Sequence, residues 1–249
     1  MDADLRFALE LADAADALTL PRFRASDLHV ETKPDLSPVT DADRAAERLL
    51  RELVARSRPG ESVLGEEEGD DGGDTRWIVD PIDGTRNFSR GIPVWATLIA
   101  LEREGRIVCG VASAPALGRR WWAARGEGAW RDGEQIRVSG ISRLEEASVS
   151  FTRSSLVDAT EQTLEIARRA WHMQPFSDFW AHVLVAEGAL EVAFEHELNI
   201  WDNAALQVIV EEAGGRFTDV GGASRIDGGS GVSTNGLLHD EVLALLSAV

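Results

Sequence analysis

One segment constrains the fold of this chain more than any other: Trp77-Ile78-Val79-Asp80-Pro81-Ile82-Asp83-Gly84-Thr85. Its apolar start is typical of a buried strand, which we expect to end at Val79. Two aspartates three positions apart follow, with a proline between them and Gly-Thr behind. Because α/β folds place their sites at strand ends, this segment predicts a sheet edge that carries two negative charges and needs a positive partner.

The chain of 249 residues is long enough for one large domain or two closely packed halves. Its single cysteine, Cys109, lies in an apolar run, which favours a core position and a reducing compartment. The N-terminal residues 1–4 lack the basic region of a signal peptide. The longest uncharged apolar stretch, Ile92 to Leu101, is shorter than the ~20 residues of a membrane span. We therefore expect a cytoplasmic protein without a membrane partner.

The formal net charge is −18. Such a chain repels nucleic acid and anionic membranes, which argues against a polyanion-binding role. A small phosphate ester meets the same repulsion. If the substrate is a phosphate, cations must therefore be recruited locally to receive it.

The spacing of apolar residues divides the chain into an α+β half over 1–141 and an α/β half over 142–249, which together form one compact catalytic unit. In the first half, helices are expected over 4–20, ending before Pro21, and from the capping segment 39–43 to Val54. An irregular stretch separates them. Strands are expected at 62–65, 76–79, 94–101, 107–114, 120–124 and 136–138, the last four as an antiparallel meander.

The second half alternates between the two element types. Strands are expected at 147–151, 189–194, 216–218 and 232–234. Helices are expected near 159–171 and at 179–188, 202–213 and 236–246. This alternation indicates an α/β arrangement for residues 142–249.

Three acidic groups are expected to follow apolar strands: Glu66-Glu67-Glu68, the Asp80/Asp83 pair, and Asp202 after Asn199-Ile200-Trp201. Clustered carboxylates repel one another, and a hard divalent cation such as Mg²⁺ relieves that repulsion. Pro81 stiffens the turn, so that Asp80, the carbonyl of Ile82 and Asp83 can face one point. Gly84 permits a tight turn, and Thr85 then opens a helix whose free N–H groups suit a phosphate oxygen.

Each group alone also has a simpler interpretation. An Asp-Pro-x-Asp run is an ordinary helix N-terminus, three glutamates in a row are an ordinary solvated loop, and Asp202 can cap a helix over 203–213. The combination carries the signal. Haloacid-dehalogenase-like phosphatases offer a competing signature, but their two aspartates are two positions apart. The residue two before Asp83 is Pro81, which can neither attack phosphorus nor bind a metal through its side chain.

With these motifs in order, the chain resembles the inositol monophosphatase family of Mg²⁺-dependent, lithium-sensitive phosphomonoesterases. The resemblance spans nearly the whole chain: Lys33 with Val39–Asp43, Gly65-Glu66-Glu67, Trp77–Thr85 with Asn87-Phe88, and Trp201-Asp202 with Glu212–Gly215. It implies a layered αβαβα sandwich, usually a homodimer, with two or three Mg²⁺ ions per site, which Mn²⁺ can replace.

The resemblance also implies roles for individual residues. Glu66, Asp80 and the Ile82 carbonyl hold one ion, while Asp80, Asp83 and Asp202 hold a second; Glu66 with water holds a third. Gly84 and Thr85 present N–H groups to the phosphate. Asp43 bonds the Thr85 hydroxyl, and these two with Glu66 orient and activate the attacking water. Lys33 is carried over as a substrate contact.

Several segments look like the histidinol-phosphatase branch of bacteria: Pro93–Ala96, Ala114–Leu117, Arg119–Ala124, and Asp178-Phe179 ahead of Val185–Ala189. In that comparison, a carboxylate at Asp178 suits the ammonium group of L-histidinol phosphate, and Glu195 shares it. Asp178 as a plain cap of the helix over 179–188 stays open. So do an inositol-1-phosphate or broad-specificity phosphatase and a non-catalytic metal-binding protein, although the water-activating pair Asp43 and Thr85 is present.

Overall fold

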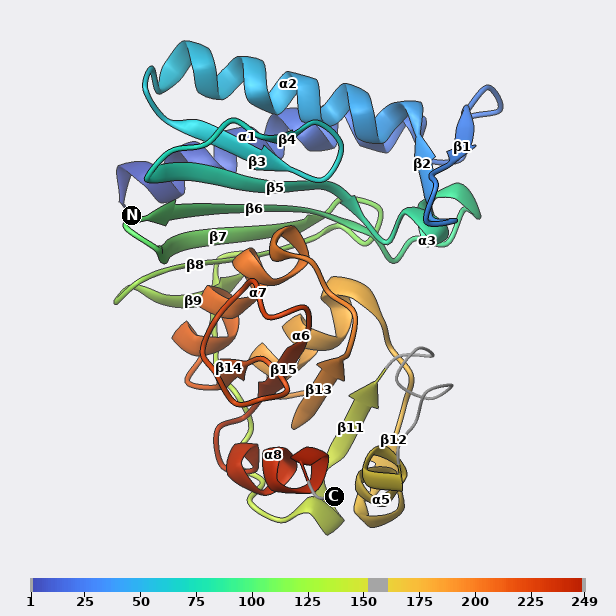
Figure 1. Cartoon of the computed structure of the whole chain (residues 1–249), viewed down its shortest axis with the longest axis vertical. Coiled ribbons are helices and arrows are strands. Elements are labelled where there is room, and N and C mark those ends of the chain that lie inside the picture. Colours follow the sequence, from blue (N-terminus) through green and yellow to red (C-terminus); the bar gives the residue numbers. More distant parts are fainter. Residues whose placement is uncertain (1, 152–160, 248–249) are drawn as a thin grey trace.

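The computed structural model describes residues 2–151 and 161–247. Two sheets are stacked between three helical layers (Figure 1). The outer layer contains α1 (Ala3–Arg22) and α2 (Asp41–Ser57). The central layer contains α6 (Asp178–Ala186) and α7 (Ile200–Glu212), and the far layer α5 (Glu161–Arg169) and α8 (His239–Ser247). The predicted αβαβα sandwich is confirmed.

The first sheet has the strand order β10-β9-β8-β7-β6-β5-β3-β4. The predicted antiparallel meander after residue 94 is present and is extended by β5 at one end and by β9 within it. Among the described strands of this sheet, β3 and β5 form the one parallel pair. The bounds are β3 (Ser62–Gly65), β4 (Gly69–Asp70), β5 (Thr75–Asp83), β6 (Ala96–Arg103), β7 (Arg106–Ala114), β8 (Arg119–Ala124), β9 (Gly128–Arg131) and β10 (Glu134–Ile136).

The second sheet has the order β12-β11-β13-β15-β14. Strand β11 runs parallel to β12 and β13, while β13 and β15 are antiparallel. Its bounds are β11 (Ser148–Phe151), β12 (His172–Met173), β13 (Val192–Glu195), β14 (Arg216–Thr218) and β15 (Gly231–Thr234), with a short 3₁₀ turn, η1 (Leu144–Glu146), ahead of β11.

Several predicted boundaries were wrong for local reasons. Helix α1 continues through Pro21, because a proline in the last turn removes only one N–H bond. The stretch expected to be irregular holds a hairpin, β1 (Val30–Thr32) with β2 (Pro38–Thr40). Strand β9 was missed, and β10 ends at Ile136 instead of starting there, since Gly- and charge-rich turns hide short strands.

In the second half, the strand expected at 189–194 is β13, which reaches Glu195, and the last helix begins only at His239. The acidic loop 66–74 contains the two-residue strand β4. Of the helix expected near 159–171, residues 161–169 are helical, whereas 159 and 160 lie outside the described residues. These shifts follow from pairing with distant strands, which no local pattern contains.

The strand β5 lies between the outer and the central helical layers and is buried on both faces. Trp77 and Val79 pack against α1 and α2, and Ile78 packs toward α7. This explains why the segment reads as a continuous apolar run. Helix α7 comes from the second half of the chain but packs on β5, β6, β7 and β8 of the first sheet. The division at residues 141/142 stays a prediction.

Among the described residues, no helix has the combined length and hydropathy required to span a membrane.

Candidate active site

The end of β5 delivers the two aspartates. The strand does not stop at Val79, as the sequence predicted, but continues to Asp83 with a register shift against β6 between Asp80 and Asp83. The bulge fits Pro81, which has no N–H to donate, and its carbonyl accepts a hydrogen bond of 2.8 Å from the Thr97 hydroxyl. The bulge therefore sets the directions of both carboxylates.

The chain turns sharply after β5. Gly84 has φ +86°, in the left-handed region, and a Cβ there would lie 3.1 Å from the carbonyl oxygen of Val94. Helix α3 (Thr85–Ser89) then begins, as the sequence predicted. The turn brings the first N–H groups of α3 to the same cavity that the two aspartates line.

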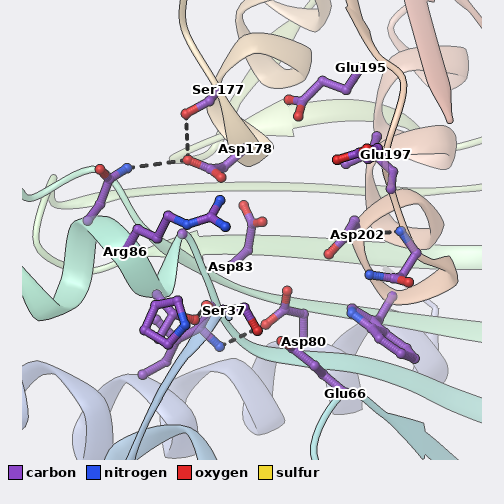
Figure 2. Close-up of a pocket in the computed structure, with 18 residues that line it drawn as sticks. Ser37, Glu66, Asp80, Asp83, Arg86, Ser177, Asp178, Glu195, Glu197 and Asp202 are labelled. Atoms are coloured by element: carbon purple, nitrogen blue, oxygen red, sulfur yellow. Dashed lines mark hydrogen bonds between the residues drawn. The ribbon is translucent and has the colours of Figure 1, made fainter. Parts of the chain in front are cut away.

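Asp202 joins the aspartates of β5 from the first turn of α7. One carboxylate oxygen from each of Asp80, Asp83 and Asp202 lies within 4.8 Å of the others (Figure 2). Asp202 is not the N-cap of a helix over 203–213: the helix begins at Ile200, Asn199 caps it, and Asp202 accepts the Asn199 N–H at 2.7 Å. The helix start therefore fixes the direction of this carboxylate.

Each of the three carboxylates is held by a backbone donor. Asp80 accepts the N–H of Ile82 at 2.9 Å, and Asp83 accepts that of Phe179 at 2.6 Å. Together with the bond from the Asn199 N–H to Asp202, each of the three carboxylates is oriented through one of its two oxygens. The three groups are thus positioned before any ligand arrives, at the cost of mutual repulsion.

The electrostatics of the cluster show that cost. Burial raises the pKa of Asp80 well above its ordinary value, and the charges of Glu66 and Asp83 raise it further. Burial and the charge of Asp178 do the same to the pKa of Asp83. Burial raises the pKa of Asp202 to about 7. A donor set of buried carboxylate oxygens in mutual repulsion fits a hard divalent cation such as Mg²⁺.

A separate network holds Glu66. Buried Glu47 of α2 accepts the N–H groups of Glu67 and Glu68 at 2.7 and 2.9 Å, so the loop after β3 is fixed to the helix. Lys33 Nζ contacts Glu66 at 2.8 Å and Glu67 at 2.5 Å. Lys33 is absent from the lining of the cavity, so its role as a substrate contact stays a prediction. Its observed partners are the carboxylates.

Asp43 lies beneath the turn that starts α3. The Thr85 hydroxyl lies 3.1 Å from Asp43 Oδ1 and 2.9 Å from the carbonyl oxygen of Ile82. Asp43 also completes a capping box with Thr40 at the start of α2. Burial raises the pKa of Asp43 to about 6, against the lowering effect of the Thr40 hydrogen bonds. The predicted contact between Asp43 and Thr85 is therefore present in the structure.

Comparison with known proteins agrees with this arrangement. The model of the inositol monophosphatase family matches residues 1–249.

The chain belongs to the inositol monophosphatase family.

Two similar curated relatives are histidinol-phosphatases. The protein of Mycobacterium tuberculosis is 52% identical over 255 residues, covering 98% of each chain. That of Streptomyces coelicolor is 49% identical over 259 residues, covering 98% of this chain and 97% of the relative. Among solved structures, the IMPase of Thermotoga maritima superposes with a TM-score of 0.90 at 32% identity, covering 98% of this chain and 97% of that chain.

In this inositol monophosphatase family member, the carboxylates line one side of a cavity of about 710 Å³. Asp178 and Glu195 lie across the cavity from Glu66 and Asp80 (Figure 2). Of the sequence-predicted site residues, Glu66, Asp80, Ile82, Asp83, Gly84, Thr85, Asp178, Glu195 and Asp202 line it, and Asp43 and Lys33 lie behind. The fold therefore brings together candidate residues that are far apart in sequence.

Asp178 is the first residue of α6, and Ser177 precedes it as the N-cap, so Asp178 does not cap a helix over 179–188. Its φ of +58° is uncommon for a residue with a side chain and points to a local constraint. Its carboxylate accepts the Ser177 hydroxyl at 2.7 Å and the Asn87 amide at 3.3 Å. These bonds fix it at the cavity.

Several lining residues escaped sequence reasoning, among them Ser37, Ser177, Glu197 and Asn199. Arg86 was given no role from the sequence, yet it is the one basic side chain among the described residues that line the cavity. In Figure 2 it lies between Asp83 and Asp178. Its position directly after Thr85 was the available signal, because a cation beside a phosphate seat is the local counter-charge that the net charge demands.

Proposed function

We propose that this protein is a metal-dependent phosphomonoesterase that hydrolyses L-histidinol phosphate, with water as the attacking group, to give L-histidinol and phosphate. The observation that carries this proposal is a cavity with carboxylates on opposite sides. Glu66 and Asp80 lie on one side, and Asp178 and Glu195 lie across from them (Figure 2). Asp83 and the turn that opens α3 adjoin Asp178. A substrate with a phosphate at one end and an ammonium group at the other is complementary to both sides of the cavity.

At the phosphate end, Glu66, Asp80 and the Ile82 carbonyl would hold one Mg²⁺, and Asp80, Asp83 and Asp202 a second. We further propose a third ion at Glu66 and Mn²⁺ as a substitute. Bound there, the metal supplies charge neutralisation for the phosphate, activation of water and stabilisation of the leaving oxygen. The donor set supports this assignment, because it consists of oxygen atoms and its three aspartates are oriented by backbone N–H groups.

The chain's own groups orient the reactants. The backbone N–H groups of Gly84 and Thr85 would bind and orient the phosphate, and Arg86 would add a positive charge beside them. Asp43 accepts the Thr85 hydroxyl, which leaves the oxygen lone pairs of Thr85 to accept a proton of the attacking water. Alignment of water, phosphorus and leaving oxygen is the main protein contribution in phosphoryl transfer.

On the side of the cavity across from Glu66 and Asp80, the ammonium group would lie between Asp178 and Glu195. Both carboxylates are desolvated, which raises the pKa of Asp178 and raises that of Glu195 well above its ordinary value. A substrate cation relieves this cost, whereas a sugar alcohol such as inositol offers only hydroxyl groups. The names of the relatives described above support the same choice.

The test is a panel of esters with Mg²⁺, comparing L-histidinol phosphate, inositol 1-phosphate and 4-nitrophenyl phosphate. We expect the highest kcat/KM for L-histidinol phosphate. Because each lost charge-assisted contact costs about 1.5–3 kcal/mol, Asp178→Asn and Glu195→Gln should each lower that kcat/KM about tenfold or more. The control is Glu134→Gln, whose side chain is 79% exposed on β10.

Equal turnover of all three esters would support a broad-specificity enzyme, and a preference for inositol 1-phosphate would support the inositol-directed alternative. No phosphate release from any of the three esters would support a non-catalytic metal-binding protein. The proposal further includes a cytoplasmic homodimer, acting in histidine biosynthesis, whose partner is a small phosphate ester. Sedimentation of the purified chain tests the dimer directly.

A further inference from the structure

Two buried polar atoms behind the cavity face each other without a hydrogen bond. His182 Nε2, on α6, lies 3.8 Å from Glu195 Oε1, at the end of β13. Both atoms are fully buried, and neither has a hydrogen-bond partner among residues 2–151 and 161–247. The His182 side chain is 1% exposed and that of Glu195 is 10% exposed. Because Oε1 is buried, the exposed part of Glu195 that lines the cavity lies elsewhere in its side chain.

The other ring nitrogen of His182 is engaged by the second sheet. Ser233 Oγ, on β15, lies 2.7 Å from Nδ1, and the ring packs near Phe217 of β14. If Ser233 donates its proton to Nδ1, the imidazole proton resides on Nε2 and points at Glu195. Burial lowers the pKa of His182 to about 4, so the ring is neutral at physiological pH. The pair thus needs only a small movement to form an N–H···O bond.

The surroundings of Glu195 explain why such a donor is useful. Burial raises the pKa of Glu195 well above its ordinary value, and the charges of Asp178 and Asp202 raise it further, against the lowering effect of a hydrogen bond with the backbone of Asp178. Each buried atom left without a partner costs about 1–3 kcal/mol. A cation in the cavity that ionises Glu195 would strengthen the attraction for the Nε2 proton and close the gap. Ligand binding and the internal hydrogen bond would then support each other.

We propose that His182 is a positioning residue: through Nε2–H···Oε1 it holds the Glu195 carboxylate from behind while that carboxylate receives the ammonium group of the substrate. This inference rests on the proposed function, since it assigns His182 to the ammonium end of the same cavity. His182 itself does not line the cavity. Substitution of His182 should therefore change the preference for amine-bearing substrates, and this change should depend on the presence of the Glu195 carboxylate.

The experiment compares His182→Leu and His182→Gln, each with and without Glu195→Gln, on L-histidinol phosphate and on 4-nitrophenyl phosphate. Leucine removes both ring nitrogens, whereas the glutamine amide places a donor near the former Nε2. Because a hydrogen bond to a charged group is worth about 1.5–3 kcal/mol, His182→Leu should lower the kcat/KM ratio of the amine ester to the amine-free ester about tenfold, mainly through KM. His182→Gln should restore most of that ratio.

With Glu195→Gln already present, adding His182→Leu should change the ratio less than about twofold, the limit expected when two residues act as one unit. Equal losses on both esters, or effects that multiply in the double variant, would overturn the proposal. If His182→Leu does not fold, His182→Asn replaces it, because its shorter amide cannot reach Glu195. If the wild type shows no amine preference, the proposed substrate fails, and the coupling of positions 182 and 195 on the preferred ester still decides the role of His182.

Discussion

Replacing Asp83 by asparagine should separate two effects of the carboxylate cluster: the repulsion that destabilises the metal-free fold and the binding of a metal ion. The substitution removes a charge but keeps the shape, and the asparagine carbonyl can still accept the Phe179 N–H that Asp83 accepts at 2.6 Å. Asp83 is buried, and burial and neighbouring charges raise its pKa well above the ordinary value. Without metal, Asp83→Asn should therefore stabilise the fold. With metal, it should remove a ligand.

The structure sets the size of the effect. The candidate ligand atoms of Asp80, Asp83 and Asp202 lie within 4.8 Å of one another. At that separation, with an effective dielectric constant of about 20, two unit charges repel by about 3.5 kcal/mol. Partial protonation already relieves some of this repulsion, so we expect a gain of about 1–3 kcal/mol in metal-free protein. For a chain of this length that gain raises Tm by about 2–12 °C.

The assay is thermal unfolding in EDTA and across a Mg²⁺ titration, together with phosphate release. At a metal concentration about 100 times Kd, wild type should gain about 2.7 kcal/mol, whereas Asp83→Asn should gain little and lose activity. The control is Asp27→Asn, whose side chain is 79% exposed and which should follow wild type in both conditions. An Asp83→Asn protein that is less stable in EDTA, or that retains full turnover and the full Mg²⁺ response, would refute the reasoning.

Two further predictions test the framework around the site. In Gly65→Ala, the new Cβ would lie 2.2 Å from Glu47 Oε1, the carboxylate that holds the loop of Glu66, so we expect a loss of about 3 kcal/mol and weaker Mg²⁺ binding. Thermal unfolding and Mg²⁺ titration measure both, and the control Gly140→Ala has open space and should be neutral; a Gly65→Ala protein as stable as the control would contradict the packing argument. His239 is buried between the hydroxyls of Thr218 and Thr234, and burial with the nearby Arg216 charge lowers its pKa from 6.5 to about 4. The unfolded chain then binds a proton that the native state refuses, so stability should be unaffected above pH 6.5 and fall by about 3 kcal/mol as pH drops to 4. Denaturant unfolding of wild type and His239→Gln across this range checks the sign: the variant should lose less stability, and identical pH profiles would rule out His239 as the cause.

The sequence alone determined the family, the layered fold and the candidate metal ligands. This was possible because the information is local: the apolar run that ends in Asp80 and Asp83 is buried on both faces, and Gly84 occupies a backbone conformation that favours glycine. The antiparallel meander could also be predicted from the sequence, since neighbouring strands in it are also neighbours in sequence. The short strand β9 was missed because its pattern spans too few residues.

Only the tertiary structure decided which side chains support the site from behind. Glu47 fixes the loop of Glu66 from a helix that precedes it, and Lys33 contacts Glu66 and Glu67 where a substrate contact was expected. His182 Nε2, on helix α6, lies 3.8 Å from Glu195 Oε1, at the end of strand β13. No periodicity or motif records such contacts, because each depends on packing between elements far apart in the chain. Ligand types follow from local sequence, whereas the directions and charges of those ligands follow from the fold.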